Sequence, residues 1–343
     1  MKFDVVVGNP PYQDENVGSN NQSTPIYNYF YDLAEKIAEK YILISPARFL
    51  SNQGATPKSW NKNMLNDEHL NIEYFNAKSN EVFPNVDIKG GIVILYRDEK
   101  KIFSAIETFI PFGELRSIYQ KVKTSIPNNI GELVYSPDSY RLTDSLFEKH
   151  SELVGRTDNS HAKAVASSIF TRYPEIFFEN KPNDEDDYVR IYGRLYGERV
   201  YRWIKRAYVA PHPNLDKYKV FVPGANGSGV IGEVISKPII GLPAIGHNQT
   251  FVSLGDFNTE YEAKALLNYI KSKFGRAMLG IMKTTQNNQA KDTWSKIPMQ
   301  DFTQNSDIDW TKSVNEIDQQ LYKKYGFDQN EINFIENKVK AMD

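Results

Sequence analysis

A short apolar run followed by Asn-Pro-Pro-Tyr constrains this chain more than any other feature. The run, residues 3–8, is rich in valine and closes with glycine, a pattern typical of a buried strand. The motif Asn9-Pro10-Pro11-Tyr12 then falls on the loop just past the carboxyl end of that strand. Open α/β sheets bind their ligands at this edge, so we expect a functional loop there.

The residue types of this motif suit chemistry on a planar amine. The amide oxygen of Asn9 and the carbonyl oxygen of Pro10 can each accept a hydrogen bond from an exocyclic NH2 group. Pro10 and Pro11 stiffen the loop and lack N–H groups that would pair locally, while the ring of Tyr12 offers a face for stacking. The simpler interpretation is a proline-rich turn after a strand. The apolar run before the motif favours a functional loop.

This motif resembles the catalytic motif of the adenine-specific DNA methyltransferases of restriction–modification systems. Residues 41–50 resemble the next strand and loop of that family, and residues 83–96 resemble a later loop and strand. The second half of the chain is similar to the target-recognition part of these enzymes. The similar segments there are residues 193–199, 226–229 and 300–310.

The resemblance implies that the chain transfers a methyl group from S-adenosyl-L-methionine to N6 of an adenine in double-stranded DNA, within a type II restriction–modification system. The target base has to leave the helix stack to be reached. Asn9, Pro10, Pro11 and Tyr12 would form the catalytic loop, with Tyr12 stacked on one face of the base and Phe83 on the other. Catalysis would consist of positioning and electrostatics.

The cofactor loop of that family is not found in the sequence. Relatives with this motif order carry a glycine-rich turn for S-adenosylmethionine ahead of Asn-Pro-Pro-Tyr, whereas only eight residues precede it here. The one glycine-dense loop, residues 224–229, follows an expected strand at 219–222. Because residues 230–235 predict another strand and no helix start, this loop is expected to join a hairpin.

Two interpretations of the missing loop stay open: an incomplete enzyme, or a non-catalytic DNA-specificity subunit or truncated methylase that needs a partner chain for the cofactor. If the family's sheet applies, the first strand lacks neighbours and presents an unpaired apolar edge, which invites pairing with a second polypeptide. Protein glutamine methyltransferases share the motif, but they keep their cofactor loop and lack a long recognition half. The spacing of Asp138, Glu148 and Lys149 does not fit a metal nuclease.

Composition limits the remaining function classes. The chain has 343 residues and a net charge of −2, so DNA binding requires a local basic patch. The absence of cysteine excludes disulfides, thiol nucleophiles and cysteine zinc sites. The five histidines lack metal-ligand spacing, so no metal is expected. No apolar run approaches 18 residues and no signal peptide is evident, which predicts a cytoplasmic protein.

Basic and aromatic residues interleave between residues 190 and 206, where Glu198 is the single acid. Such a segment is typical of phosphate contacts and guanine recognition, although a solvated face with core aromatics would have the same composition. A polar stretch beginning at Lys283 is a second candidate, equally well explained as a helix-ending loop. The residues expected to bind DNA are Arg190, Arg194, Arg199, Arg202, Lys205, Arg206, Lys283 and Gln286.

The expected fold class is α/β, with a partial Rossmann-like methyltransferase sheet followed by an α+β target-recognition domain. Residues 1–110 would form the catalytic part and residues 111–343 the recognition domain with C-terminal helices. The first part predicts a mostly parallel sheet with strands at 41–45, 71–76 and 92–96, and helices at 25–40, capped by Thr24, and 57–67. The second part predicts strands between 188 and 256, helices at 261–282 and 309–325, and a capping box formed by Asp328 and Glu331.

Overall fold

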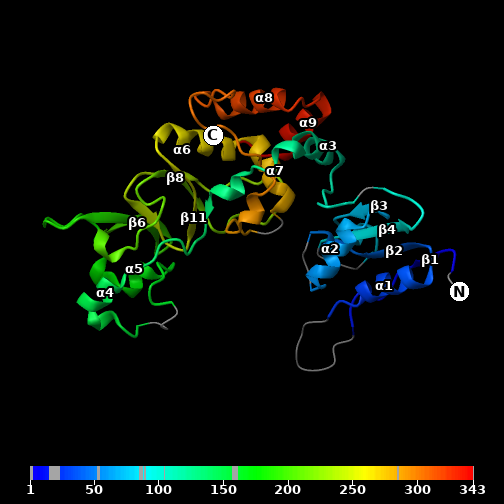
Figure 1. The fold of residues 1–343 in the computed structure, drawn as a ribbon, viewed down its shortest axis with the longest axis horizontal. Coiled ribbons are helices and arrows are strands. Elements are labelled where there is room, and N and C mark those ends of the chain that lie inside the picture. Colours follow the sequence, from blue (N-terminus) through cyan, green and yellow to red (C-terminus); the bar gives the residue numbers. More distant parts are fainter. Residues whose placement is uncertain are drawn as a thin grey trace. The chain divides into compact units, whose positions relative to one another are not determined.

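The computed structural model describes residues 3–14, 24–51, 55–84, 88, 90–103, 105–156, 161–283 and 286–342. The chain forms two compact units, Met1–Pro111 and Phe112–Asp343. Both units mix helices and strands (Figure 1). Among the described residues, no helix has the length and apolar character needed to cross a membrane.

The first unit is built on a four-stranded sheet in the order β1-β2-β4-β3. β1 runs parallel to β2, whereas β4 runs antiparallel to both β2 and β3. The prediction of a mostly parallel sheet is therefore wrong, because β4 returns from β3 without a crossover helix and inserts between β3 and β2. The elements are β1 (Val6–Gly8), α1 (Tyr27–Ile37), β2 (Lys40–Pro46), α2 (Lys58–Asn66), β3 (Leu70–Asn76) and β4 (Ile92–Asp98).

β1 is a three-residue strand at the edge of this sheet. The prediction of a buried strand is wrong: Val7 is 68% exposed and Val5 is 48% exposed, because both lie on the sheet face away from α1 and β1 has a strand neighbour on one side only. The edge is nevertheless apolar, as expected for a strand that lacks its neighbours. Ile42 and Tyr74 on the same sheet are exposed as well.

Helix α1 covers one face of the sheet, opposite to the face on which Ile42 is exposed. Its buried side chains include Tyr27, Tyr31 and Ala34, which pack in one core with Leu43 of β2. α1 begins two residues later than predicted, and Thr24 is not its cap. Instead, the carbonyl of Thr24 accepts a hydrogen bond from the Asp14 amide at 3.0 Å, so this segment pairs with the end of the motif loop.

The second unit contains two further sheets. One has the order β10-β6-β7 and the other β5-β11-β8-β9. Their strands are β5 (Val134–Tyr135), β6 (Tyr188–Leu195), β7 (Glu198–Lys205), β8 (Tyr218–Pro223), β9 (Ile239–Gly241), β10 (Ile245–His247) and β11 (Phe251–Phe257). The helices are α3 (Gly113–Val122), α4 (Asp144–Lys149), α5 (Ile169–Arg172), α6 (Glu260–Lys271), α7 (Lys273–Met282), α8 (Val314–Lys324) and α9 (Gln329–Lys338).

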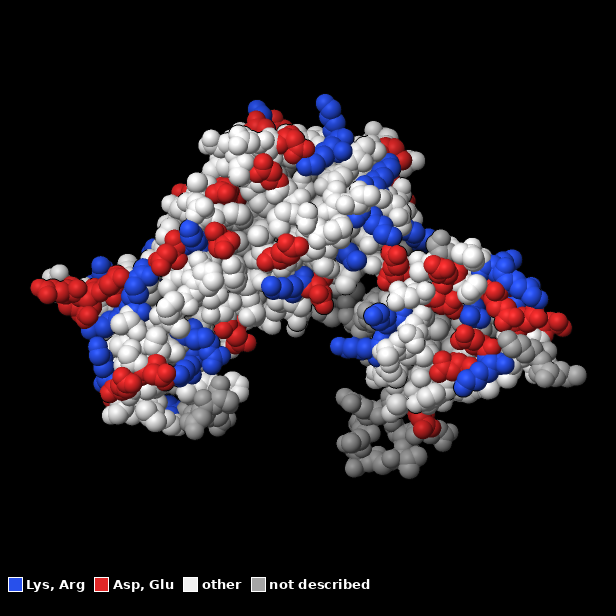
Figure 2. All heavy atoms as spheres, in the orientation of Figure 1, with Lys and Arg blue, Asp and Glu red and all other residues white. Residues whose placement is uncertain are grey.

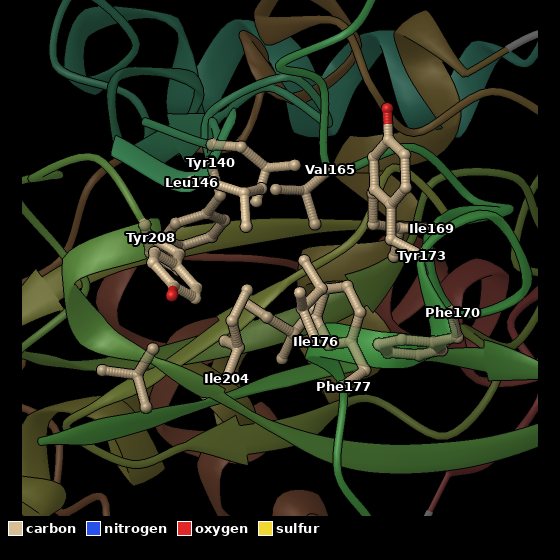
Figure 3. Packing of buried hydrophobic residues seen from close by; sticks show 14 of the residues in the cluster. Tyr140, Leu146, Val165, Ile169, Phe170, Tyr173, Ile176, Phe177, Ile204 and Tyr208 are labelled. Carbon is tan, nitrogen blue, oxygen red and sulfur yellow. The ribbon is translucent and has the colours of Figure 1, made fainter. Parts of the chain in front are cut away.

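One face of the β6–β7 hairpin rests on a hydrophobic core. Figure 3 shows Ile204 of β7 pointing towards Ile176 and Phe177, with Leu146 of α4 and Ile169 of α5 in the same cluster. Strand alternation sends the residues on the other side of the hairpin away from this core. The core thus fixes one face of the hairpin, while Tyr192 and Tyr201 on the other face pack in a second cluster with Phe221 and Phe251.

Three predictions for the second unit need correction. The helix expected at 261–282 is two helices, because Ser272 takes an extended conformation and caps α7 by accepting from the Gly275 amide. The helix expected at 309–325 begins only at Val314, where Ser313 and Glu316 form a capping box. No strand lies at 230–235. The predicted capping box at the start of α9 is confirmed.

Candidate functional site

The Asn-Pro-Pro-Tyr loop lies at the end of the first sheet where the carboxyl ends of several strands meet. β1, β2 and β3 end at this edge and β4 starts there, since Pro46 and Asn76 both pair with Ile92. The Ala47 amide donates to the Gly91 carbonyl at 2.9 Å, which ties the loop after β2 to the residue before β4. The motif therefore sits at the carboxyl end of its strand, on a rigid support.

The four motif residues differ in exposure. Asn9 and Pro11 are exposed, Pro10 is buried and Tyr12 is half-buried. The Tyr12 hydroxyl is buried beside the Asn9 side chain and makes no well-formed hydrogen bond with the described residues. Burial raises the pKa of Tyr12, and the neighbouring Asn9 side chain partly offsets that rise. An exposed amide beside an anchored ring is suited to receive a flat, amine-bearing molecule from outside.

Aromatic rings packed between α1 and the sheet support the loop. The Tyr31 hydroxyl lies 2.9 Å from Ser45 Oγ at the end of β2, and burial raises the pKa of Tyr31 far above its ordinary value. Phe49 and Trp60 pack together, with ring centroids 5.0 Å apart. The Ile26 amide donates to the Tyr12 carbonyl at 3.2 Å, which ties the end of the motif to the start of α1. These contacts limit the movement of Asn9 and Tyr12 relative to the sheet.

Phe83, predicted to stack on the second face of a base, is half-buried on the loop between β3 and β4. Its amide donates to the Ser79 carbonyl at 2.8 Å. This loop ends at the same sheet edge as the motif. No contact between Phe83 and Tyr12 is present among the described ring pairs. Part of the same predicted loop, residues 85–87 and 89, lies outside the described residues.

A groove of about 320 Å³ runs beside the motif, between β1 and α1. Its walls are apolar and include Val6, Gly8, Pro10, Phe30 and Leu33. S-adenosylmethionine carries a ribose and an amino-acid group that need polar partners, and no acidic side chain lines this groove. This groove alone therefore does not provide the polar partners that the cofactor needs, although it opens next to Asn9.

The glycine-dense loop does not replace the missing cofactor site. Its backbone amides are already used: the Glu233 carboxylate accepts from the Ser228 amide at 2.9 Å and from the Gly229 amide at 3.2 Å. Lys283 Nζ donates to the Asn226 carbonyl at 2.7 Å. The same nitrogen forms an ion pair with Glu233 Oε2 at 3.6 Å. The loop begins the connection between the antiparallel strands β8 and β9, so the second strand of this hairpin is β9 and not the predicted strand at 230–235.

Replacing Glu233 with glutamine is expected to lower stability by about 2 kcal/mol at pH 7. Burial alone would raise the pKa of Glu233, but the Ser228 and Gly229 hydrogen bonds and the Lys283 charge lower it to about 2. A carboxylate with a lowered folded-state pKa stabilises the fold at pH above its unfolded pKa, and this stabilisation is lost as the pH falls from there through the folded pKa. Urea unfolding of the wild type and E233Q should thus converge as pH falls below about 4. An equal gap at pH 7 and pH 3 would contradict this, and E185Q in an exposed loop is the control.

The basic and aromatic segment forms the β6–β7 hairpin. Strand pairing places three cross-strand pairs on the same face of the hairpin. They are Arg190 with Trp203, Tyr192 with Tyr201, and Arg194 with Arg199. The Arg190 guanidinium lies over the rings of Tyr201 and Trp203, 5.1 and 5.2 Å from their centroids. Arg202 is on the other face and donates to the Tyr201 carbonyl at 3.0 Å.

Charges at the base of the hairpin are neutralised by an acidic loop. Lys205 pairs with Asp186, and Arg206 pairs with Asp187 at 2.6 Å and with Asp216 at 2.9 Å. The acidic loop at 184–187 is thus a partner of the basic segment. Figure 2 likewise shows basic and acidic side chains interspersed over the visible surface.

The remaining predicted DNA contacts differ in accessibility. Arg194 and Gln286 are exposed, whereas Lys283 is 7% exposed and paired with Glu233. Arg199 donates to the Ser236 carbonyl at 2.8 Å and to the Lys237 carbonyl at 2.6 Å, near the hairpin turn. The described residues contain no group of three or more side chains arranged to hold a metal ion.

Residues 1–83 match the family model of the Eco57I restriction-modification methylase. A Mycoplasma pneumoniae (strain ATCC 29342 / M129 / Subtype 1) protein described as an uncharacterized adenine-specific methylase is 29% identical over 161 residues, which cover 43% of this chain and 37% of that protein. The chain thus spans little more than a third of that relative's length. The matches support a methyltransferase role and a resemblance to part of a restriction–modification adenine methylase.

Two solved structures are also similar. The type IIG restriction endonuclease BpuSI aligns with 98% of this chain and 53% of its own, at 12% identity and a TM-score of 0.38. The type IIL restriction-modification enzyme MmeI, solved in complex with DNA, aligns with 98% of this chain and 56% of its own, at 10% identity and a TM-score of 0.33.

Proposed function

We propose that this chain supplies the base-acceptor and DNA-recognition parts of a DNA adenine N6-methyltransferase of a restriction–modification system. The observation that carries the proposal is the Asn-Pro-Pro-Tyr loop, held at the carboxyl edge of a sheet within a segment that matches a methylase family model. The first unit would be the catalytic part and the second the target-recognition domain. The proposed partner is double-stranded DNA.

The acceptor side of the reaction follows from the motif. Asn9 Oδ1 and the Pro10 carbonyl would accept hydrogen bonds from the two N–H groups of the N6 amine, which raises the electron density on nitrogen. Tyr12 would stack on the base once it has left the helix. Because the ring is held by the packing of the loop, its face is in place before the base arrives.

The donor side is proposed to come from protein outside the described residues. S-adenosylmethionine would supply the methyl group, and the apolar groove beside Asn9 lacks the polar groups to hold it. The exposed apolar edge at Val5 and Val7 supports the addition of a further strand beside β1, from a second polypeptide that carries the cofactor site. Such a strand would bring the cofactor next to Asn9.

A test of this function begins by selecting duplexes from a random DNA library with the purified chain. We expect a common adenine-containing sequence. When 2-aminopurine replaces that adenine, its fluorescence should rise on binding, because the base leaves the stack. The absence of any enriched sequence, or binding without a fluorescence rise at any adenine, would refute the acceptor assignment.

A non-catalytic DNA-specificity subunit is the second candidate, favoured by the incomplete cofactor site. Calorimetric titration of S-adenosylmethionine into the chain distinguishes the two. Binding together with methyl transfer by the chain alone would place the donor site in it and remove the second candidate. No binding, with methylation restored by a partner chain and dependent on Asn9, would assign the chain to the acceptor half. Binding of DNA with no dependence on Asn9 would favour the specificity subunit.

A further inference from the structure

Two adjoining hollows lie in the second unit, next to the turn of the β6–β7 hairpin. The first has a volume of about 860 Å³ and lies between the hairpin turn and residues 234–238. The second has a volume of about 630 Å³ and lies between the starts of α7 and α8. Lys271 and Met342 line both, so the hollows share a wall.

The first hollow is basic. Arg194, Arg199, Lys237 and Lys271 line it, against Glu198 as its single acid. Arg194 and Lys237 are exposed. Arg199 is fixed by hydrogen bonds to backbone carbonyls, which leave its positive charge uncompensated. In contrast to Lys205 and Arg206 at the hairpin base, none of these four forms an ion pair with an acidic side chain among the described residues.

The acidic groups of the second hollow are occupied internally. The Asp318 carboxylate accepts from the Lys273 and Phe274 amides, both at 2.9 Å, and so caps α7. Glu336 pairs with the Lys273 ammonium. Lys271 and the exposed Lys312 also line this hollow, and neither forms an ion pair with an acidic side chain among the described residues.

Arg276 places a further positive charge in the lining of the second hollow. It is 1% exposed; its Nε donates to the Lys271 carbonyl at 3.1 Å, and its Nη2 has no hydrogen-bond partner among the described residues. Burial lowers the pKa of Arg276 to about 10, so the group stays charged at neutral pH. Arg276 thus adds a positive charge to the lining, which the Asp318 carboxylate in the same lining partly offsets.

We propose that the two hollows form one continuous track for the phosphodiester backbone of DNA, running from Arg194 at the hairpin turn past Lys237 and Lys271 to Lys312 at the start of α8. The proposal rests on the proposed DNA-methylating function and assigns the backbone contacts within it. It selects the turn end of the hairpin over its base, because Lys205 and Arg206 at the base are paired with acidic side chains, whereas Arg194 and Arg199 at the turn end form no ion pair with the described residues. Three of these four track residues lie outside the basic segment seen in the sequence.

The test compares two triple variants of the full chain by fluorescence anisotropy on a duplex that the wild type binds. The track variant carries Arg194→Gln, Lys237→Gln and Lys271→Gln. Its control carries Lys62→Gln, Lys149→Gln and Lys323→Gln, exposed lysines outside both hollows with the same change in net charge. We expect the track variant to bind about 100-fold more weakly at low salt, and its slope of log K against log salt to fall by about 2 to 3.

The outcomes separate the track from the function it serves. An unchanged slope in the track variant, or equal losses in both triples, would overturn the track while leaving DNA methylation in place. No duplex binding by the wild type would remove both. If the track triple does not fold, as judged by circular dichroism, the single variant Lys237→Glu in an exposed segment replaces it; binding equal to the wild type would then count against the track.

Discussion

An Asn9→Ala variant should lose about 10²- to 10³-fold in the rate of methyl transfer in any active assembly. Asn9 is exposed at the sheet edge, and its amide oxygen is a proposed acceptor for the target amine. Alanine removes that acceptor, so the amine is no longer oriented or polarised as charge develops on it. Little loss of stability is expected, because an exposed side chain contributes little to packing.

The decisive measurement is single-turnover methyl transfer together with duplex affinity. Affinity should stay within about threefold of the wild type, because base contacts near the reacting amine are separate from the phosphate contacts that dominate binding. Asn63→Ala, an exposed asparagine on α2, is the matched control and should behave as the wild type. Full methyl transfer by Asn9→Ala would exclude the motif as the acceptor site, and a parallel loss of DNA binding would indicate a structural role.

The position of this site could be predicted from local sequence, whereas the surroundings of its strand could not. The apolar run closed by Gly8 does end in a strand, and Asn9 follows it directly. Burial of Val7 depends on whether another strand lies beside it, and no pattern within residues 3–8 encodes that. Strand direction is similar: residues 92–96 predict a strand, but its antiparallel insertion between β2 and β3 depends on the whole sheet.

Helix breaks and charge pairing also depend on the tertiary structure and could not be predicted from local sequence. Apolar spacing continues through Ser272, so periodicity predicts one helix, although the serine caps a second one. The charge density at residues 190–206 was visible, but its neutralisation by Asp186, Asp187 and Asp216 required the tertiary structure. Lys237, Lys271 and Lys312 are too far apart in sequence to form a pattern, and folding brings them to one surface.

Substitutions of Tyr12 should separate its ring from its hydroxyl. Tyr12→Phe is expected to keep methyl transfer within about threefold of the wild type, because the hydroxyl makes no well-formed hydrogen bond with the described residues and burial already disfavours its ionised form. Tyr12→Ala removes the stacking face, and loss of one base–aromatic stack costs about 1–3 kcal/mol. Methyl transfer by Tyr12→Ala should therefore fall by about 10- to 100-fold.

A duplex with 2-aminopurine at the target adenine identifies the step that Tyr12 serves. If the ring holds the extruded base, Tyr12→Ala should bind the duplex while showing a smaller fluorescence rise, and Tyr12→Phe should match the wild type. Tyr29→Ala, which removes an exposed ring of α1 outside the motif, is the control for loss of an aromatic side chain. If Tyr12→Phe were as impaired as Tyr12→Ala, the hydroxyl, and not the ring face, would be the group that holds the extruded base. The Tyr12 hydroxyl would then need a partner supplied by DNA, cofactor or a second polypeptide, and the stacking role would be withdrawn.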